Sequence, residues 1–194
     1  ADHYDRALAE FAWPEIGETF NWAIEWFDVI AQDNDRPALW IVEQDGTELQ
    51  VSFAELARRS DQLAGWFSSV GISQGDRVMT MLGNQVELWE SVLALMKLGA
   101  VLVPSTTALG TRELRDRIER GGIRHVIANT VDADKFDEVQ GEYTRISIGA
   151  RRDGWIDYAA SADSDLAAPA AVVHPDDPLL VYFTSGTTSL PKMV

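Results

Sequence analysis

Nine consecutive residues near the end of the sequence have the composition of an anion-binding loop. They are Thr184, Ser185, Gly186, Thr187, Thr188, Ser189, Leu190, Pro191 and Lys192. Hydroxyl groups and successive backbone N–H groups can donate hydrogen bonds to anionic oxygens, and Gly186 lets the backbone approach a ligand closely. Lys192 adds a full positive charge. These residue types together predict a site for a phosphate-bearing ligand.

The residues before this loop predict where it lies. Leu179–Phe183 is a short apolar run, which indicates a strand buried on both faces. Ligands of open α/β sheets bind beyond the carboxyl ends of the strands, where this loop begins. It is not a Walker loop, because Pro191 precedes the lysine and Met193 follows it. A P-loop kinase or GTPase is therefore disfavoured, while a polar surface loop without a ligand stays an alternative.

The rest of the sequence predicts the elements that must hold the loop in place. Strands are expected at 38–42, 48–51, 77–82, 101–103, 125–128 and 145–148, and helices at 21–32, 56–70, 85–98, 111–120, 133–139 and 155–160. The first two strands form a hairpin around a turn at Asp45 and Gly46, and later strands alternate with helices over short connections. That alternation predicts an α/β fold, with a mainly parallel sheet flanked by helices and an N-terminal β-hairpin. One domain covers 1–194.

Local signals set several boundaries. Ser52 and Glu55 form a capping box, in which each side chain is expected to accept a backbone N–H. Gly71 stands where a left-handed helix cap is expected. The first twenty residues are expected to form an irregular arm with about one helical turn. Aromatic residues of the 21–32 helix are expected to pack into the core, and 167–178 is expected to be a surface connection.

Composition excludes several classes of protein. The formal net charge is −15, from 16 basic and 31 acidic residues, so nucleic-acid binding is disfavoured. No apolar run is long enough to span a membrane, and no signal pattern opens the sequence. The absence of cysteine excludes disulfides, thiolate metal sites and cysteine catalysis, and it fits a cytoplasmic location.

The histidines and a pair of aspartates attract no catalytic or metal role. His3, His125 and His174 are isolated from one another, and surface or strand-end positions are expected for them. Asp176 and Asp177 lie just before a proline and are expected to be turn residues. The sequence therefore predicts no metal site.

The loop resembles a known signature. Residues 182–192 are similar to the loop of the adenylate-forming superfamily, which comprises acyl-CoA synthetases, luciferases and peptide-synthetase adenylation domains and reads T-S-G-T-T/S-G-x-P-K. Gly75–Val78 resembles the family's G-D-x-V strand start, and Leu98–Pro104 resembles its G-A-x-x-x-P element. Residues 20–23 and 38–40 look most like the medium-chain acyl-CoA synthetase branch. Ser189 departs from the pattern, since the family usually has glycine there.

The resemblance implies a two-step reaction. A carboxylic acid, either a medium-chain fatty acid or an aryl acid, attacks the α-phosphate of ATP, and CoA then displaces AMP from the acyl-adenylate. Residues 184–192 would hold the β- and γ-phosphates, with Mg²⁺ accompanying them. Adenine recognition, the catalytic lysine and the CoA site lie beyond this loop in the family. The chain is therefore expected to be an incomplete AMP-binding domain that is inactive alone.

Two further functions stay open at this point. The same fold serves as an adenylation domain that loads a carrier protein, and dependence on free CoA would separate this function from a synthetase. A non-catalytic nucleotide-binding module is the other alternative, which calorimetry with ATP would test. An incomplete sheet also exposes apolar surface, so formation of a homodimer is an expectation.

Overall fold

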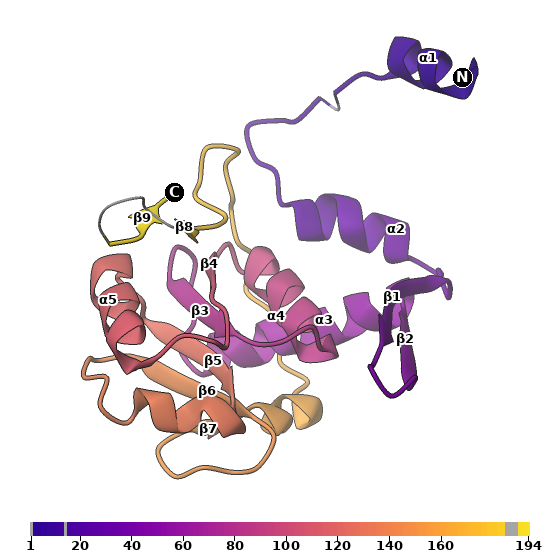
Figure 1. Ribbon diagram of the computed structural model, residues 1–194. Helices are drawn as coiled ribbons and strands as arrows, with labels where there is room; N and C mark the ends of the chain where they lie inside the picture. The colour runs from indigo at the N-terminus through magenta and orange to yellow at the C-terminus, as the bar shows by residue number, and fades with distance from the viewer. Residues whose placement is uncertain (1, 14, 185–189) are drawn as a thin grey trace.

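Five parallel strands form the central sheet of the computed structural model, which describes residues 2–13, 15–184 and 190–194 (Figure 1). They are β3 (Arg77–Met81), β4 (Val101–Pro104), β5 (His125–Asn129), β6 (Thr144–Ile148) and β7 (Ile156–Asp157). Their order in the sheet is β4-β3-β5-β6-β7, and each neighbouring pair is parallel. The predicted α/β class and parallel sheet are confirmed.

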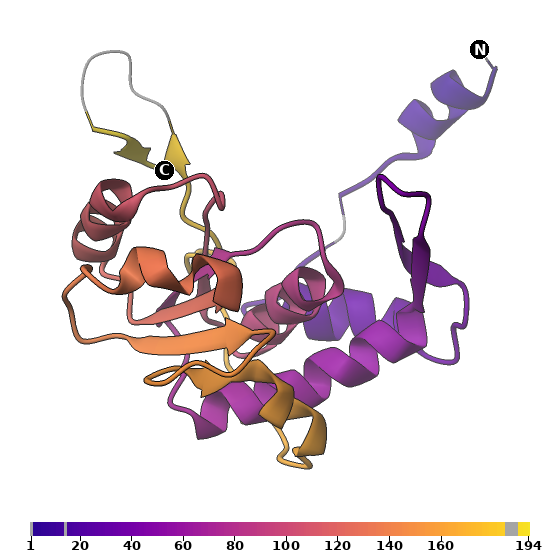
Figure 2. The same ribbon diagram turned by 60° about the horizontal axis from the view of Figure 1, so that its bottom comes forward.

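Helices cover both faces of this sheet, as Figures 1 and 2 show. On one face lie α3 (Phe53–Ser69) and α4 (Val86–Lys97), and on the other lie α5 (Thr111–Gly121) and the 3-10 helix η2 (Thr130–Phe136). Because side chains alternate along a strand, neighbouring residues of β3 pack against helices on opposite faces of the sheet. Val78 packs with α3 and α4, whereas Met79 packs with α5.

The predicted capping box is half confirmed. The Ser52 hydroxyl accepts a hydrogen bond from the Glu55 amide at 3.1 Å, so α3 begins where the sequence predicts. The Glu55 carboxylate instead accepts hydrogen bonds from Arg58 and Arg59 on the next turn. Two arginines within reach outcompete a single backbone N–H, because charge-assisted bonds are the stronger ones. Gly71 follows the helix with φ 99°, the left-handed conformation predicted for it.

The predicted β-hairpin is confirmed as β1 (Pro37–Val42) and β2 (Glu48–Ser52), which pair in antiparallel fashion. Before it, the helix expected at 21–32 forms as a π-helical segment, η1 (Ala23–Asp28), continued by α2 (Val29–Ala31). Ala23 and Phe27 are buried against the hairpin, α3 and α4. The prediction of core packing for the aromatic residues here is wrong for two of them. Trp22 and Trp26 are 43% and 47% exposed, so neither ring is fully covered, although the Trp22 ring lies beside Phe27 with ring centroids 6.0 Å apart.

The N-terminal arm contains more helix than predicted. Its α1 (Asp2–Glu10) spans nine residues, where about one turn was expected. Both views place α1 apart from the rest of the molecule (Figures 1 and 2). Two short elements also differ from prediction. Residues 155–160 form β7 and then the 3-10 helix η3 (Tyr158–Asp163), and the helix expected at 133–139 is η2, displaced toward the N-terminus.

The largest correction concerns residues 179–183, predicted as a buried strand. Leu180 alone among them bridges to the central sheet, in parallel with Leu102 of β4, and Leu179 and Leu180 are 46% and 39% exposed. Their backbone does join the sheet, since the Leu102 amide donates to Leu179 and the Val181 amide donates to Leu102. In the described part of the chain, residues 179–183 lie at the edge of the sheet beside β4. Other residues therefore cover their apolar side chains on one side only, and the segment is not buried as predicted.

A close backbone contact fixes the start of the 167–178 connection, which is irregular as predicted. A Cβ atom added to Gly65 of α3 would lie 1.7 Å from the carbonyl oxygen of Leu166, so only glycine fits at this position. On the preceding turn, the Gln62 side chain donates to the carbonyl groups of Ala162 and Ser164 at 2.7 and 3.0 Å. This connection therefore starts anchored to α3 before it leads toward the candidate loop.

None of the helices in the described part of the chain combines the length and apolar character needed to span a bilayer.

Candidate functional site

The candidate loop closes a two-stranded hairpin. Strands β8 (Phe183–Thr184) and β9 (Lys192–Met193) pair in antiparallel fashion, with Thr184 opposite Lys192. The pairing continues outward, because Tyr182 and Val194 exchange both backbone hydrogen bonds at 2.8 and 2.9 Å. Side chains directly opposite each other in an antiparallel pair share one face. The hairpin therefore brings a hydroxyl group and an ammonium group together at the base of the loop.

The predicted site residues fall into two groups. Thr184, Leu190, Pro191 and Lys192 are described, and Ser185, Gly186, Thr187, Thr188 and Ser189 lie outside the described residues. Thr184, Leu190 and Lys192 are exposed to solvent, and Pro191 is half-buried. The Thr184 hydroxyl donates to the Lys192 carbonyl at 3.5 Å. The described groups thus leave the Lys192 side chain accessible to an anion, and the Thr184 hydroxyl can donate to the same anion only by turning away from the Lys192 carbonyl.

The hairpin lies beyond the carboxyl end of β4. Residues 180–184 run parallel to β4 from the Leu180–Leu102 bridge, so they leave the sheet where β4 ends. This confirms the expected edge of the sheet, although the preceding strand is not buried. Carboxyl ends of parallel strands are where ligands of open α/β sheets bind.

Helix α5 supports both arms of the hairpin. The guanidinium carbon of Arg117 lies 5.0 Å from the centre of the Phe183 ring, and its Nη1 donates to the Ser105 hydroxyl at 3.3 Å. Burial lowers the pKa of the Arg117 guanidinium. On the other arm, Arg120 donates through Nη2 to the Pro191 carbonyl at 2.9 Å. The sequence predicts α5 as a charged helix but contains no signal that these two arginines face the loop.

The point where the strand order reverses, between β3 and β5, is occupied by protein groups. Gln85 precedes α4 and Asn129 ends β5, and their side-chain amides exchange hydrogen bonds at 2.8 and 3.1 Å. The Gln85 amide also donates to Glu87. These donors and acceptors satisfy one another, so the hairpin offers the stronger ligand site.

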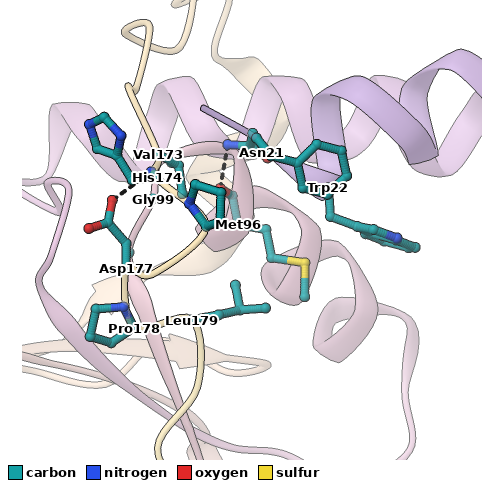
Figure 3. Close-up of a pocket in the computed structure, with 12 residues that line it drawn as sticks. Asn21, Trp22, Met96, Gly99, Val173, His174, Asp177, Pro178 and Leu179 are labelled. Carbon is teal, nitrogen blue, oxygen red and sulfur yellow. Dashed lines mark hydrogen bonds between the residues drawn. The ribbon is translucent and has the colours of Figure 1, made fainter. Parts of the chain in front are cut away.

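A small pocket of about 290 Å³ lies next to the segment that leads into the hairpin (Figure 3). Asn21 closes one side, with its side-chain amide donating to the Met96 carbonyl at 2.8 Å. On the other side, the His174 amide donates to Asp177 at 2.8 Å, which confirms the predicted turn. The His174 ring contacts the Glu18 carbonyl at 2.9 Å. Because these polar groups bind backbone or one another, we interpret this pocket as a structural junction.

His125 lies at the opposite, amino-terminal edge of the sheet. It opens β5 as predicted but is only 5% exposed, and its Nε2 is 3.4 Å from Asp76 Oδ2. Burial lowers the pKa of the imidazole, with the Asp76 carboxylate opposing that effect. Within the described residues no cluster of three or more His, Asp or Glu side chains is suited to a metal ion, and so no Mg²⁺ ligand is assigned.

Folding stability is expected to fall as the pH is lowered from about 7.5 to about 5.5. Burial holds the pKa of folded His125 below the 6.5 of a free imidazole, so the unfolded chain binds more protons in this range. Urea denaturation at both pH values should show that His125→Gln reduces this dependence. The matched variant His174→Gln, which removes an exposed imidazole, should retain it. Equal pH dependence in the parent and His125→Gln would contradict the assignment.

Comparison with known proteins finds acyl-CoA synthetases among the proteins that this chain resembles. Human mitochondrial acyl-coenzyme A synthetase ACSM5 is 30% identical over 92% of this chain and 33% of its own length. A Brucella canis acyl-CoA synthetase has a TM-score of 0.86 at 26% identity, covering 98% of this chain and 37% of that one. The N-terminal subdomain of Klebsiella oxytoca NpsA, bound to 3-hydroxyanthranilyl-AMSN, has a TM-score of 0.69 at 27% identity, covering 91% and 40%.

These similarities cover only part of each relative. The chain spans about a third of the length of the curated relatives it matches. The family model for AMP-binding enzymes matches residues 26–194, which include the sheet, its helices and the whole candidate loop. The chain therefore belongs to the AMP-binding enzyme family, and its described fold is that of the N-terminal part of an acyl-CoA synthetase.

Proposed function

We propose that the chain supplies the nucleotide-phosphate loop of an ATP-dependent acyl-CoA synthetase. The observation that carries this proposal is the pairing of Thr184 with Lys192 beyond the carboxyl end of β4, in a chain that belongs to the AMP-binding family. An exposed ammonium beside a hydroxyl suits the β- and γ-phosphates of ATP. Residues 184–192 as a whole form the proposed binding loop.

The proposed reaction needs little covalent chemistry from these residues. A carboxylate oxygen attacks the α-phosphorus of ATP, the bond to the bridging oxygen breaks, and pyrophosphate leaves. Lys192 and the Thr184 hydroxyl stabilise the charge that builds up on the leaving pyrophosphate. The CoA thiol then attacks the acyl carbon and releases AMP. Mg²⁺ would neutralise part of the phosphate charge.

A medium-chain fatty acid or an aryl acid is the proposed substrate. Similarity to the ACSM group of acyl-coenzyme A synthetases supports the first, and similarity to an NpsA subdomain bound to an aryl ligand supports the second. An adenylation domain that loads a carrier protein is the second candidate function. NpsA favours it, since it has also been described in an artificial fusion with a carrier domain. A cytoplasmic location and a homodimer stay predictions, and the human ACSM5 relative is mitochondrial.

Calorimetry with ATP and thioester assays test the proposal. The 194-residue chain is expected to bind ATP, and no CoA thioester is expected when ATP, octanoate or benzoate, and CoA are added. A chain that extends to the full length of its relatives should form the thioester with free CoA. Turnover only with a phosphopantetheinyl carrier would favour the second candidate. Thioester formation by the 194 residues alone would contradict the expected inactivity, and absence of ATP binding by the extended chain would contradict the assigned loop.

A further inference from the structure

Phe183, the first residue of β8, is held by one turn of α5. Its ring packs at the edge of the buried cluster formed by β3, β4, β5 and α5. A Cβ atom added to Gly121 would lie 3.2 Å from Phe183 Cζ, so α5 and the ring are in close contact. The Arg117 guanidinium covers the ring at 5.0 Å, in the range of a cation–π interaction. Its buried Nε has no hydrogen-bond partner among the described residues, which leaves the ring and Ser105 as its described polar contacts.

The returning arm is held by the next turn of the same helix. Arg120 donates to the Pro191 carbonyl at 2.9 Å, and its Nη1 contacts Asp116 at 2.9 Å. Residues three apart on a helix lie on the same side, so Arg117 and Arg120 reach the two arms from one surface of α5. Between these two contacts lie the paired residues Thr184 and Lys192.

We propose that Arg117 and Arg120 are positioning residues for nucleotide binding, acting through Phe183 and Pro191. They fix the two arms against α5 and so set the separation and direction of Thr184 and Lys192. The inference rests on the proposed function, because it concerns how the phosphate loop is held. Neither arginine is assigned a contact with the nucleotide. The two arginines also place positive charge at the base of a loop in a chain whose net charge is −15.

The variants separate anchoring from charge and from helix stability. Arg120→Ala removes the bond to Pro191 together with the ion pair to Asp116, whereas Asp116→Asn removes the ion pair alone. Arg112→Ala removes an exposed positive charge from the same helix. Arg120→Lys retains a donor that can reach a carbonyl group. For the other arm, Arg117→Ala is compared with Arg117→Lys, which keeps a cation but loses the planar group that stacks on a ring.

Two measurements follow each variant, affinity for ATP by calorimetry and hydrogen exchange of the Tyr182 and Val194 amides. Arg117→Ala and Arg120→Ala are expected to weaken ATP binding about three- to tenfold and to speed exchange at both amides. Arg120→Lys should recover part of the loss. Asp116→Asn and Arg112→Ala should leave affinity within about twofold and exchange unchanged.

Equal affinity and equal exchange in all these variants would overturn the inference while leaving the proposed function intact. If neither the 194 residues nor the extended chain binds ATP, the proposed function fails, and the exchange rates alone decide whether α5 anchors the hairpin. Faster exchange at the Val126 amide in an alanine variant would show that the variant destabilises the central sheet as a whole. In that case, the comparison of Arg120→Lys with Asp116→Asn tests the inference instead. Arg120→Lys must then show the faster exchange at Tyr182 and Val194, and the opposite order would overturn the inference.

Discussion

Replacing Lys192 with alanine is expected to weaken ATP binding by about tenfold or more. Lys192 is exposed and lies opposite Thr184 at the base of the loop, so its ammonium can reach a phosphate without displacing another protein group. A charge-assisted contact of this kind depends on ionic strength. Calorimetry with ATP at low and high salt should therefore show a steeper salt dependence for the parent chain than for Lys192→Ala.

Two matched variants make this prediction sharper. Lys192→Arg keeps the charge on a longer, planar group, and affinity is expected to stay within about fivefold of the parent. Arg151→Ala removes one exposed positive charge from the loop that follows β6, and it should leave affinity unchanged. A Lys192→Ala chain that binds ATP as tightly as Arg151→Ala would show that the ammonium does not contact the phosphates.

The second large effect is expected at Lys97, the most deeply buried cation among the described side chains that form ion pairs. Its side chain is 2% exposed, and Nζ lies 2.9 Å from Asp28 and 2.5 Å from Asp61. Burial raises the pKa of Asp28, with Lys97 opposing that effect. Lys97→Ala leaves Asp28 without its counter-charge, and we expect it to lower the free energy of unfolding by about 3 kcal/mol. Urea denaturation measures this loss.

A compensated pair tests the cause of that loss. Replacing both charges, as Asp28→Asn with Lys97→Met, retains most of the volume and leaves no buried charge unpaired. Such replacements of buried ion pairs are often neutral, so the double variant should recover most of the stability lost in Lys97→Ala. Asp61→Asn should cost much less, because the Asp61 side chain is 63% exposed. A double variant as unstable as Lys97→Ala would indicate that packing, and not unpaired charge, explains the loss.

Signals that act within a few residues made much of the fold predictable. The Ser52 cap, the glycine after α3 and the turn at Asp45 and Gly46 depend only on neighbouring backbone, and each appears where the sequence predicts it. Whether an apolar segment is covered depends on distant parts of the chain. Leu179 and Leu180 therefore look like a buried strand in the sequence but lie half-exposed at a sheet edge. Trp22 and Trp26 follow the same rule, since periodicity alone does not identify the covered face.

The candidate site divides in the same way. The loop itself was predictable, because its residue types and spacing follow one another along the chain from Thr184 to Lys192. The contacts of α5 that hold the loop were not predictable. Arg120 is 71 residues before Pro191, and it contacts a backbone carbonyl, which every residue type carries. Arg117 and Phe183 are likewise joined only by the packing of α5 beside β4.

The antiparallel register of the hairpin determines which changes in length the chain can tolerate. Successive side chains of a strand point to opposite faces, so one residue inserted between Tyr182 and Thr184 would turn the Thr184 side chain away from that of Lys192. Insertion of two residues would restore the facing and shift the position along the arm. Insertions or deletions of two residues in one arm should therefore be accepted more readily than those of one residue. A small set of variants with one or two residues added or removed would show this difference.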